Sequence, residues 1–315
     1  MPELRRDLLN PTLEKILNIF KLDKFYVRGR GCRLTDETGE SCLDFISQYG
    51  AVPFGYNPAF VWEALDRVKE AGIPSLVQPS LPIEALRLAN RLAEIAPGDL
   101  TYCTFCQSGA EAVEAGIKLA RSTTGRDLII ATDNSFHGKT LGALSATGKK
   151  SYQQPFCAPA PGFIHIPYND PEALEAAVKL YPDRVAAFIV EPIQGEGGII
   201  PAAPGYLKKA REVCERSGII FILDEIQTGL GRTGWLFACE HDEVRPDILL
   251  LSKALGGGMV PLGVCISSAR IWNEDFGHLH SSTFANNNLA CAVGNAVVDR
   301  LLEADQAIIK QVREK

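Results

Sequence analysis

Three features are scarce or missing in this 315-residue sequence. It has no basic run and a formal net charge of −6, which argues against nucleic acid or an anionic membrane surface as a partner. The uncharged stretch at residues 254–269 is broken by glycine and proline and is too short to span a bilayer. Its nine cysteines follow no paired spacing, which predicts reduced thiols in a cytoplasmic protein.

One cysteine pair does have a motif-like spacing. Cys103 and Cys106 form a C-x-x-C, but neither a second pair nor a histidine-ligand pattern accompanies them. Two cysteines packed along a strand are the favoured interpretation, and metal or redox use is the alternative. No metal site is predicted.

What is present from about residue 100 onward is an alternation of apolar strands and helical patterns. Several of the apolar runs are continuous, as in strands that are buried on both faces. This predicts an α/β fold with a mostly parallel sheet, in which ligands bind beyond the carboxyl ends of the strands. Upstream, GCRLTDETGESCLDF predicts a hairpin around residues 36–39. Strands are predicted at 128–132, 163–167, 185–192, 219–225, 247–252 and 261–268, and helices at 112–121 and 205–216.

A lysine stands at the end of one of these runs, in DILLLSKALGGGMVPLG (residues 247–263). Lysine is seldom buried, and three glycines in a row are costly to order, so a purely structural segment would avoid both. Asp224 ends the strand IIFILDE, which predicts an acid and an amine over the same crevice. In a dry pocket the pKa of Lys253 would fall, which makes the free amine available as a nucleophile. A lysine whose head reaches water is the alternative.

Two glycine-containing motifs are candidates for phosphate binding. Ser108 and Glu111 in CQSGAEAVEAGIKLAR have capping-box spacing, and the N-terminus of the helix that follows would suit a phosphate. A simple helix cap is the alternative. GLGRTG (residues 229–234) fits the dinucleotide pattern G-x-G-x-x-G, but WLFACEH after it does not read as the start of a helix. The second match is therefore interpreted as coincidental.

Together these motifs resemble the class III aminotransferases, which are pyridoxal-phosphate enzymes of fold type I. The resemblance runs from about Tyr26 to the C-terminus, and FHGKTLGALSAT is most similar to the putrescine aminotransferase branch. It implies a cofactor-binding large domain at 51–297, flanked by parts of a small α+β domain at 1–50 and 298–315. The motifs that carry it, in the family's order and approximate spacing, are SGAEAVEAGIKLAR, FHGKTLGALSAT, EPIQGEGG, LDEIQTGLGRTG, SKALGGG and HSSTF.

The resemblance implies a role for each residue around the cofactor ring. Lys253 would form a Schiff base with the aldehyde of pyridoxal phosphate and later carry the proton between substrate and cofactor, and the glycines after it would let the backbone pass close to the cofactor. Asp224 would pair with the pyridinium nitrogen, and Gln227 would hydrogen-bond the phenolic oxygen. Phe136 would stack on the ring, and His137 is assigned to the same cofactor site.

The same resemblance implies a phosphate site that two subunits share. The backbone of Gly109 and Ala110 would hold the phosphate, with the hydroxyl of Ser108 added. Thr283, in HSSTF, would reach the phosphate of the neighbouring subunit. The implied assembly is a homodimer with shared active sites.

Two charged positions, Lys139 and Glu196, bear on the substrate. Glu196, in QGEGG, corresponds to the family's gating glutamate, and Glu191, near the same pocket, is assigned to the cofactor site. Family members that take ornithine or acetylornithine carry arginine where this chain has Lys139. An ammonium is a poor substitute for a guanidinium fork that grips a carboxylate. The amino donor is therefore expected to be a diamine or another ω-amine.

The sequence also departs from the family near its end. TFANNNLA replaces a glycine-rich loop, and the family usually continues beyond the point where this chain stops, so its C-terminal small domain is expected to be truncated. The tail, residues 286–315, is predicted to be a helix that leads onward.

The function predicted from these features is a cytoplasmic, pyridoxal-phosphate-dependent aminotransferase. It would move a terminal amino group from a small amine to 2-oxoglutarate, giving glutamate and an aldehyde. The alternatives are an ornithine or acetylornithine aminotransferase, an aminomutase or decarboxylase of the same family, and a non-catalytic fragment that keeps the fold. The last alternative is a nicotinamide-dependent dehydrogenase that would bind its dinucleotide at GLGRTG.

Overall fold

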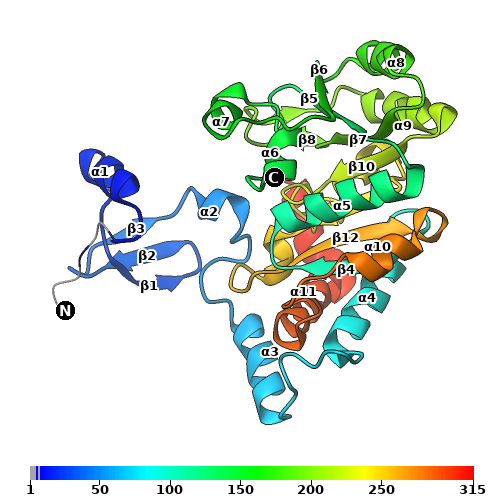
Figure 1. Ribbon diagram of the computed structural model, residues 1–315. Coiled ribbons are helices and arrows are strands. Elements are labelled where there is room, and N and C mark those ends of the chain that lie inside the picture. The colour runs from blue at the N-terminus through cyan, green and yellow to red at the C-terminus, as the bar shows by residue number, and fades with distance from the viewer. Residues whose placement is uncertain (1–4, 6–7) are drawn as a thin grey trace.

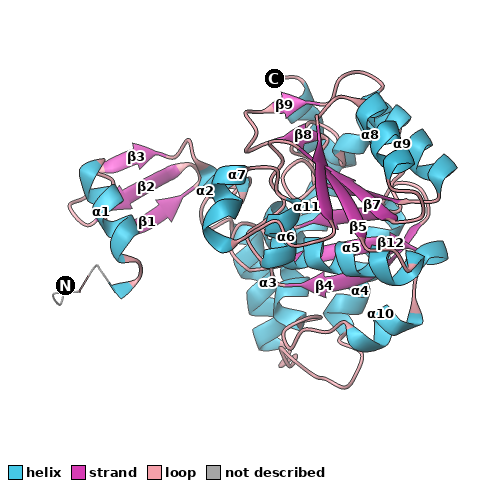
Figure 2. Cartoon of the chain, turned by 45° about the horizontal axis from the view of Figure 1, so that its top comes forward, coloured by secondary structure: helices cyan, strands magenta, loops and turns pink. Residues whose placement is uncertain are grey.

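The computed structural model describes residue 5 and residues 8–315, and its N-terminal part projects from the rest of the molecule (Figures 1 and 2). This part contains α1 (Pro11–Ile19) and an antiparallel sheet of β1 (Tyr26–Arg30), β2 (Arg33–Asp36) and β3 (Ser41–Leu43). At the turn between β2 and β3, Asp36 Oδ1 accepts hydrogen bonds from the backbone N–H groups of Thr38 and Glu40 at 3.0 and 2.9 Å. The predicted hairpin is therefore confirmed.

The body of the molecule is built on a seven-stranded sheet in the order β4-β12-β11-β10-β7-β5-β6. The pairings of β10 with β11 and β7, and of β5 with β6 and β7, are parallel, whereas β12 runs antiparallel to β11 and β4. The predicted α/β fold with a mostly parallel sheet is confirmed. The strands are β4 (Leu100–Cys106), β5 (Leu128–Thr132), β6 (Phe163–Ile166), β7 (Val185–Val190), β10 (Ile220–Asp224), β11 (Ile248–Leu251) and β12 (Gly263–Ser268).

Helices cover both faces of this sheet (Figure 2). One face packs against α4 (Ile83–Ile95), α8 (Pro171–Leu180), α9 (Tyr206–Ser217) and α11 (Asn288–Arg313). The other packs against α5 (Gly109–Thr124), α6 (Leu141–Ala146) and α10 (Glu274–Leu279). Along β7 every side chain is buried, and Phe188 and Ile189 point to opposite faces. The other α-helices and strands are α2 (Ser47–Gly50), α3 (Ala59–Glu70), α7 (Lys150–Gln153), β8 (Ile193–Gln194) and β9 (Ile200–Pro201).

The C-x-x-C pair lies on β4, as the favoured interpretation expected. Residues three apart on a strand point to opposite faces, because side chains alternate. Cys103 accordingly packs with one layer of helices and Cys106 belongs to the core on the other side. The two thiols therefore cannot act as a redox pair. No cluster of three or more His, Cys, Asp or Glu side chains suited to a metal ion occurs among the residues that the structure describes.

The C-terminal tail is helical, as predicted, but α11 is interrupted. Residues 303–306 depart from helical geometry, with positive φ at Ala304, Asp305 and Gln306. After this break the chain returns to the body, where Arg313 Nε donates a hydrogen bond to the Gly234 oxygen at 2.8 Å and its guanidinium lies over the Trp235 ring. None of the helices between residues 8 and 315 has the length and apolar character needed to cross a bilayer.

Candidate active site

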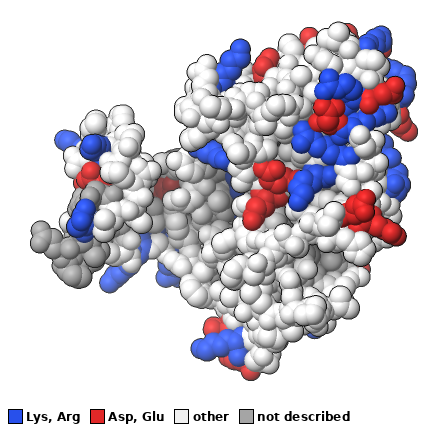
Figure 3. Space-filling model, viewed as in Figure 1, with Lys and Arg blue, Asp and Glu red and all other residues white. Residues whose placement is uncertain are grey.

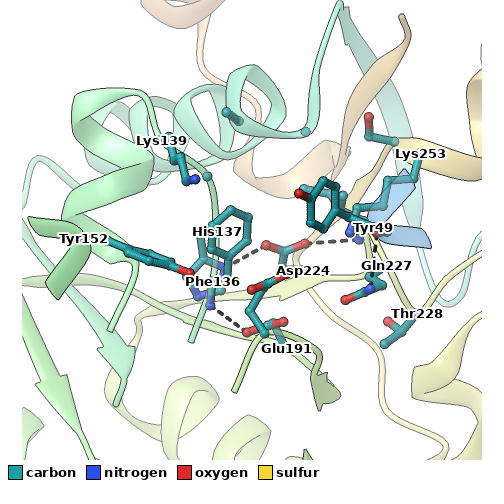
Figure 4. A pocket seen from close by; sticks show the side chains of 16 residues that line it. Tyr49, Phe136, His137, Lys139, Tyr152, Glu191, Asp224, Gln227, Thr228 and Lys253 are labelled. Atoms are coloured by element: carbon teal, nitrogen blue, oxygen red, sulfur yellow. Dashed lines mark hydrogen bonds and ion pairs between the residues drawn. The ribbon is translucent and has the colours of Figure 1, made fainter. Parts of the chain in front are cut away.

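The carboxyl ends of four adjacent strands meet around one cavity of about 560 Å³ (Figure 4). The segment after β5 contributes Phe136 and His137, and Glu191 directly follows β7. Asp224 is the last residue of β10, and Lys253 comes two residues after β11. The cavity is lined by Tyr49, Gly109, Ala110, Phe136, His137, Gly138, Lys139, Tyr152, Glu191, Glu196, Asp224, Ile226, Gln227, Thr228, Ser252 and Lys253.

A buried acid and a buried histidine form the floor of this cavity. Asp224 is only 4% exposed, and its Oδ2 lies 2.7 Å from His137 Nδ1. Its Oδ1 accepts a hydrogen bond from the backbone N–H of Ile226 at 3.1 Å. Burial by itself lowers the pKa of His137, but the carboxylates of Asp224 and Glu191 outweigh it and raise that pKa. His137 Nε2 has no hydrogen-bond partner although it is buried.

Lys253 reaches the cavity from a strained backbone position. Its φ is +40°, a conformation that L-residues seldom adopt, and such strain clusters at functional sites. Burial lowers the pKa of its ammonium, although Asp224 and Glu191 act in the opposite direction. A lysine of lowered pKa carries a larger share of free amine, which is the form that can attack a carbonyl or accept a proton.

The glycines after Lys253 have a different role from the predicted one. They were expected to let the backbone pass close to the cofactor, but residues 256–258 do not line the cavity. A Cβ on Gly257 would lie 2.6 Å from Val61 Cγ2, and one on Gly258 would lie 3.0 Å from Val52 Cα. Both residues also have positive φ. The glycine run therefore allows close packing against α3 and the segment before it.

The N-terminus of α5 opens into the cavity through the backbone of Gly109 and Ala110. Ser108 caps this helix, because its Oγ accepts a hydrogen bond from the Glu111 N–H at 3.2 Å. Glu111 does not complete a full capping box, since its Oε2 accepts from the N–H of Gln107, one residue before the cap. Ser108 does not line the cavity, so its hydroxyl serves the helix. The free N–H groups at this helix end suit an anion.

Two more predicted residues lie at the opening of the cavity. Glu196 is exposed, and its backbone oxygen accepts a hydrogen bond from Lys149 Nζ. Lys139 is also exposed, and its Nζ lies 5.1 Å from the centre of the Tyr152 ring. Gln227 lies deeper, with its Nε2 3.4 Å from the Tyr49 oxygen. Of the predicted site residues, all line the cavity except Ser108 and Thr283.

Thr283 lies in the exposed segment before α11, away from the cavity. The neighbouring Ser282 Oγ donates a hydrogen bond to Gln107 Oε1 at 2.7 Å, which places this segment beside the start of α5. The role predicted for Thr283 concerns a second subunit and stays a prediction.

Two aromatic residues of the cavity wall were missed by the sequence analysis. Tyr49 comes from the N-terminal part, where Ser47, Gln48 and Tyr49 all have positive φ. The ammonium groups of Lys139 and Lys149 lie 5.1 and 5.4 Å from the centre of the Tyr152 ring, which meets the Phe136 ring edge-on at 6.4 Å. Neither tyrosine carries a local sequence signal, because both reach the cavity only through the tertiary fold.

The GLGRTG motif forms turns after β10 and is followed by a short 3-10 helix at Ala238–Asp242, not by an α-helix. The structural context that a dinucleotide site requires is therefore absent from this motif, as predicted.

The residues of the cavity fit pyridoxal phosphate. The helix end at Gly109 suits its phosphate, Phe136 suits the face of its ring, and the Asp224 carboxylate suits a protonated ring nitrogen. Lys253 supplies an amine for its aldehyde, and the unpartnered His137 Nε2 leaves hydrogen-bonding capacity at the floor.

Comparison with known proteins agrees with this fit. Residues 19–315 match the family described as aminotransferase class-III. A crystal structure of the ornithine aminotransferase from Toxoplasma gondii ME49 is 33% identical, with a TM-score of 0.85 over 98% of this chain and 74% of that one. Another structure of the Toxoplasma enzyme is described as having PLP at partial occupancy in its active site.

Two further solved structures are similar to this chain. An (S)-enantioselective omega-transaminase from Thermomicrobium roseum is 30% identical, with a TM-score of 0.83 over 95% of this chain and 76% of that one. The adenosylmethionine-8-amino-7-oxononanoate aminotransferase from Methanocaldococcus jannaschii is 27% identical, with a TM-score of 0.87 over 96% and 77%. The neighbours therefore act on different amino donors by their descriptions.

Proposed function

Because this chain belongs to the class III aminotransferase family, whose cofactor is pyridoxal phosphate, we propose that it transfers a terminal amino group from a diamine or another ω-amine to 2-oxoglutarate. The observation that carries amino transfer is Lys253, a lysine of lowered pKa that shares one cavity with the buried Asp224. The reduced cysteines support a cytoplasmic location for this enzyme.

The residues of the cavity divide the work of the reaction. When bound, pyridoxal phosphate supplies an electron sink for the negative charge that develops at the amino-bearing carbon. Lys253 Nζ would accept the proton from that carbon in its free-amine form and pass it on to the cofactor. Burial favours this form because it lowers the pKa of the lysine. Asp224 holds a negative charge at the floor of the cavity, and His137 orients this carboxylate through the 2.7 Å contact. The Phe136 ring forms a wall that excludes water.

The donor class rests on Lys139. Its ammonium lies against the Tyr152 ring at the cavity opening, whereas ornithine and acetylornithine enzymes are expected to use arginine there. A point charge engaged with an aromatic ring is a weak grip for a substrate carboxylate. Glu196, at the same opening, favours a distal ammonium on the donor. The resemblance of FHGKTLGALSAT to the putrescine aminotransferase branch points the same way.

An ornithine-type enzyme is the second candidate. It is favoured by the 33% identity to the Toxoplasma ornithine aminotransferase over 98% of this chain. The two candidates differ in what the far end of the donor carries, an ammonium or an α-carboxylate.

The test measures the rate of the donor half-reaction for a panel of amine donors. The change in cofactor absorbance that accompanies this half-reaction reports the rate. Putrescine and related diamines should react faster than ornithine and acetylornithine. Lys139→Arg should shift the preference toward the carboxylated donors, while Lys150→Arg, a neighbouring exposed lysine that does not line the cavity, should not. A wild-type preference for acetylornithine would refute the diamine proposal and leave amino transfer standing.

A homodimer is also part of this proposal. The surface below α10 and around α4 is largely uncharged in Figure 3, apart from the acidic first turn of α10. Charged side chains of both signs gather around α5, α8 and α9. Leu81 and Leu279 are each 81% exposed, and Phe284, next to Thr283, is 56% exposed. A second copy would cover apolar surface of this kind. Light scattering that gave the mass of a single chain at micromolar concentration would argue against it.

A further inference from the structure

We propose that Glu191 is a positioning residue, which holds two cavity-lining segments together through its carboxylate. This inference rests on the cofactor of the proposed function but not on the identity of the amine. The family resemblance assigns Glu191 to the cofactor site itself. The hydrogen bonds of its carboxylate indicate that it acts on the cofactor through Phe136 and through the segment that carries Glu196.

Glu191 directly follows β7, and both of its carboxylate oxygens are used. Oε1 accepts a hydrogen bond from the backbone N–H of Phe136 at 2.9 Å (Figure 4). Oε2 accepts one from the backbone N–H of Gly195 at 3.2 Å. Since β5 and β7 are parallel neighbours, the segments that follow them lie side by side. One carboxylate therefore joins the segment that carries the Phe136 ring to the segment that carries Glu196.

Only an ionised carboxylate can make both of these bonds well. It offers acceptors at both oxygens, whereas a protonated carboxyl or a glutamine amide places a donor against one of the two N–H groups. A buried N–H that loses its acceptor is costly. The bonds at Phe136 and Gly195 are therefore sensitive to the charge of Glu191.

The surroundings of Glu191 bring its titration into the physiological range. It is 5% exposed, and burial raises the pKa of its carboxyl to about 7, with His137 lowering this pKa and Asp224 raising it. Two further charged side chains share the cavity with Glu191. The Lys253 ammonium interacts with it electrostatically, and Glu196 lines the opening of the cavity. On the opposite side, Tyr168 donates its O–H to the backbone oxygen of Glu191 at 3.0 Å.

A second tie between the two segments should keep the fold intact when Glu191 is changed. Gln194 Nε2 donates to Thr132 Oγ1 at 3.0 Å and to the Asp133 oxygen at 2.8 Å. Loss of the Glu191 bonds should therefore loosen Phe136 and Gly195 without separating the segments.

The experiment measures the dissociation constant of pyridoxal phosphate for the wild-type chain and for Glu191→Gln at pH 8.5 and pH 6. At pH 8.5 the variant should bind about tenfold more weakly, because one partly buried N–H has lost its acceptor. At pH 6, where Glu191 of the wild type is itself largely protonated, the two proteins should differ by less than about threefold. This difference in pH dependence separates positioning from a general structural defect.

Glu225→Gln is the matched control. Glu225 is also buried, with a pKa raised to about 7 by burial, and its oxygens accept backbone N–H groups from Ala238 at 2.6 Å and Cys239 at 2.8 Å. It does not line the cavity. Its substitution should change the dissociation constant by less than about twofold at either pH.

Hydrogen exchange of the wild-type holoenzyme provides a measurement that does not depend on a variant. After correction for intrinsic rates, peptides containing Phe136 and Gly195 should be less protected at pH 6 than at pH 8.5. Unchanged cofactor binding in Glu191→Gln, a loss of the same size at both pH values, or equal protection of these peptides would overturn the proposal. None of these readouts uses an amine donor, so an error in the proposed donor class would not produce them.

Discussion

Replacing Asp224 with asparagine removes the negative charge that pairs with His137 at the floor of the cavity, and it preserves the shape of the side chain. Asp224 is 4% exposed, contacts His137 Nδ1 at 2.7 Å, and accepts the Ile226 N–H at 3.1 Å. An asparagine can keep the bond from Ile226, but it has no charge with which to hold a proton on the cofactor's ring nitrogen. The substitution should therefore weaken stabilisation of the transition state, in which the cofactor ring must accept negative charge.

The size of this effect follows from the charges that the carboxylate contacts. A hydrogen bond to a charged group is worth about 1.5–3 kcal/mol, and each 1.36 kcal/mol of lost transition-state stabilisation slows the reaction about tenfold. Loss of the contact to the ring nitrogen alone therefore predicts a decrease of about ten- to a hundredfold, and loss of the His137 pairing adds to it. We expect Asp224→Asn to lower turnover by at least about a hundredfold.

The assay is the rate of the donor half-reaction at saturating amine, with folding checked by circular dichroism and thermal unfolding. Asp247→Asn is the control, because Asp247 is 3% exposed and paired with Arg211 at 2.7 Å, but precedes β11 at the opposite end of the strands. This control should lose stability and keep its rate. A folded Asp224→Asn protein that turns over within about threefold of the wild type would refute the role of Asp224.

Two more predictions follow from buried titratable groups. Borohydride reduction of the holoenzyme followed by peptide mapping should place the cofactor on Lys253, and label on another lysine would contradict this assignment. Lys253→Ala should abolish turnover but retain cofactor binding through the phosphate. Burial raises the pKa of Glu225 from 4.5 to about 7, so its stabilising contribution is full below about pH 4.5 and is lost as the pH rises through 7. We expect the free energy of unfolding of Glu225→Gln, measured in urea relative to that of the wild type, to increase by about 2 kcal/mol between pH 5 and pH 8. Equal differences at both pH values would show that the pKa of the Glu225 carboxyl is not raised.

Local patterns were sufficient for six of the seven strands of the central sheet and for the two central site residues. Continuous apolar runs such as VAAFIV predict strands that are buried on both faces, and the structure contains β7 there. Asp224 and Lys253 could be placed over one crevice because each follows such a run directly, and parallel strands bring their carboxyl ends to the same edge. The hairpin at residues 36–39 was equally local, since a turn and its flanking strands are adjacent in the chain.

Other features depend on segments that are distant in the chain, and no local pattern reports them. The glycines after Lys253 were assigned to the cofactor, but Gly257 and Gly258 are required by the close approach of Val61 and Val52. The break in α11 at residues 303–306 allows the tail to return to Trp235, although the apolar periodicity alone predicted a helix that continues. In both cases contact with another segment decided the outcome.

The sequence by itself determined the α/β class, the cofactor lysine candidate and its acidic partner, because hydrophobic periodicity and strand-end position are properties of neighbouring residues. Only the tertiary structure decided that His137 pairs with Asp224, that Glu191 joins Phe136 to Gly195, and that Tyr49 and Tyr152 complete the cavity wall. These contacts join residues between 4 and 87 positions apart, or residues from separate parts of the fold. Their hydrogen bonds and the pKa shifts that come with them arise from burial and distance, which exist only once the chain has folded.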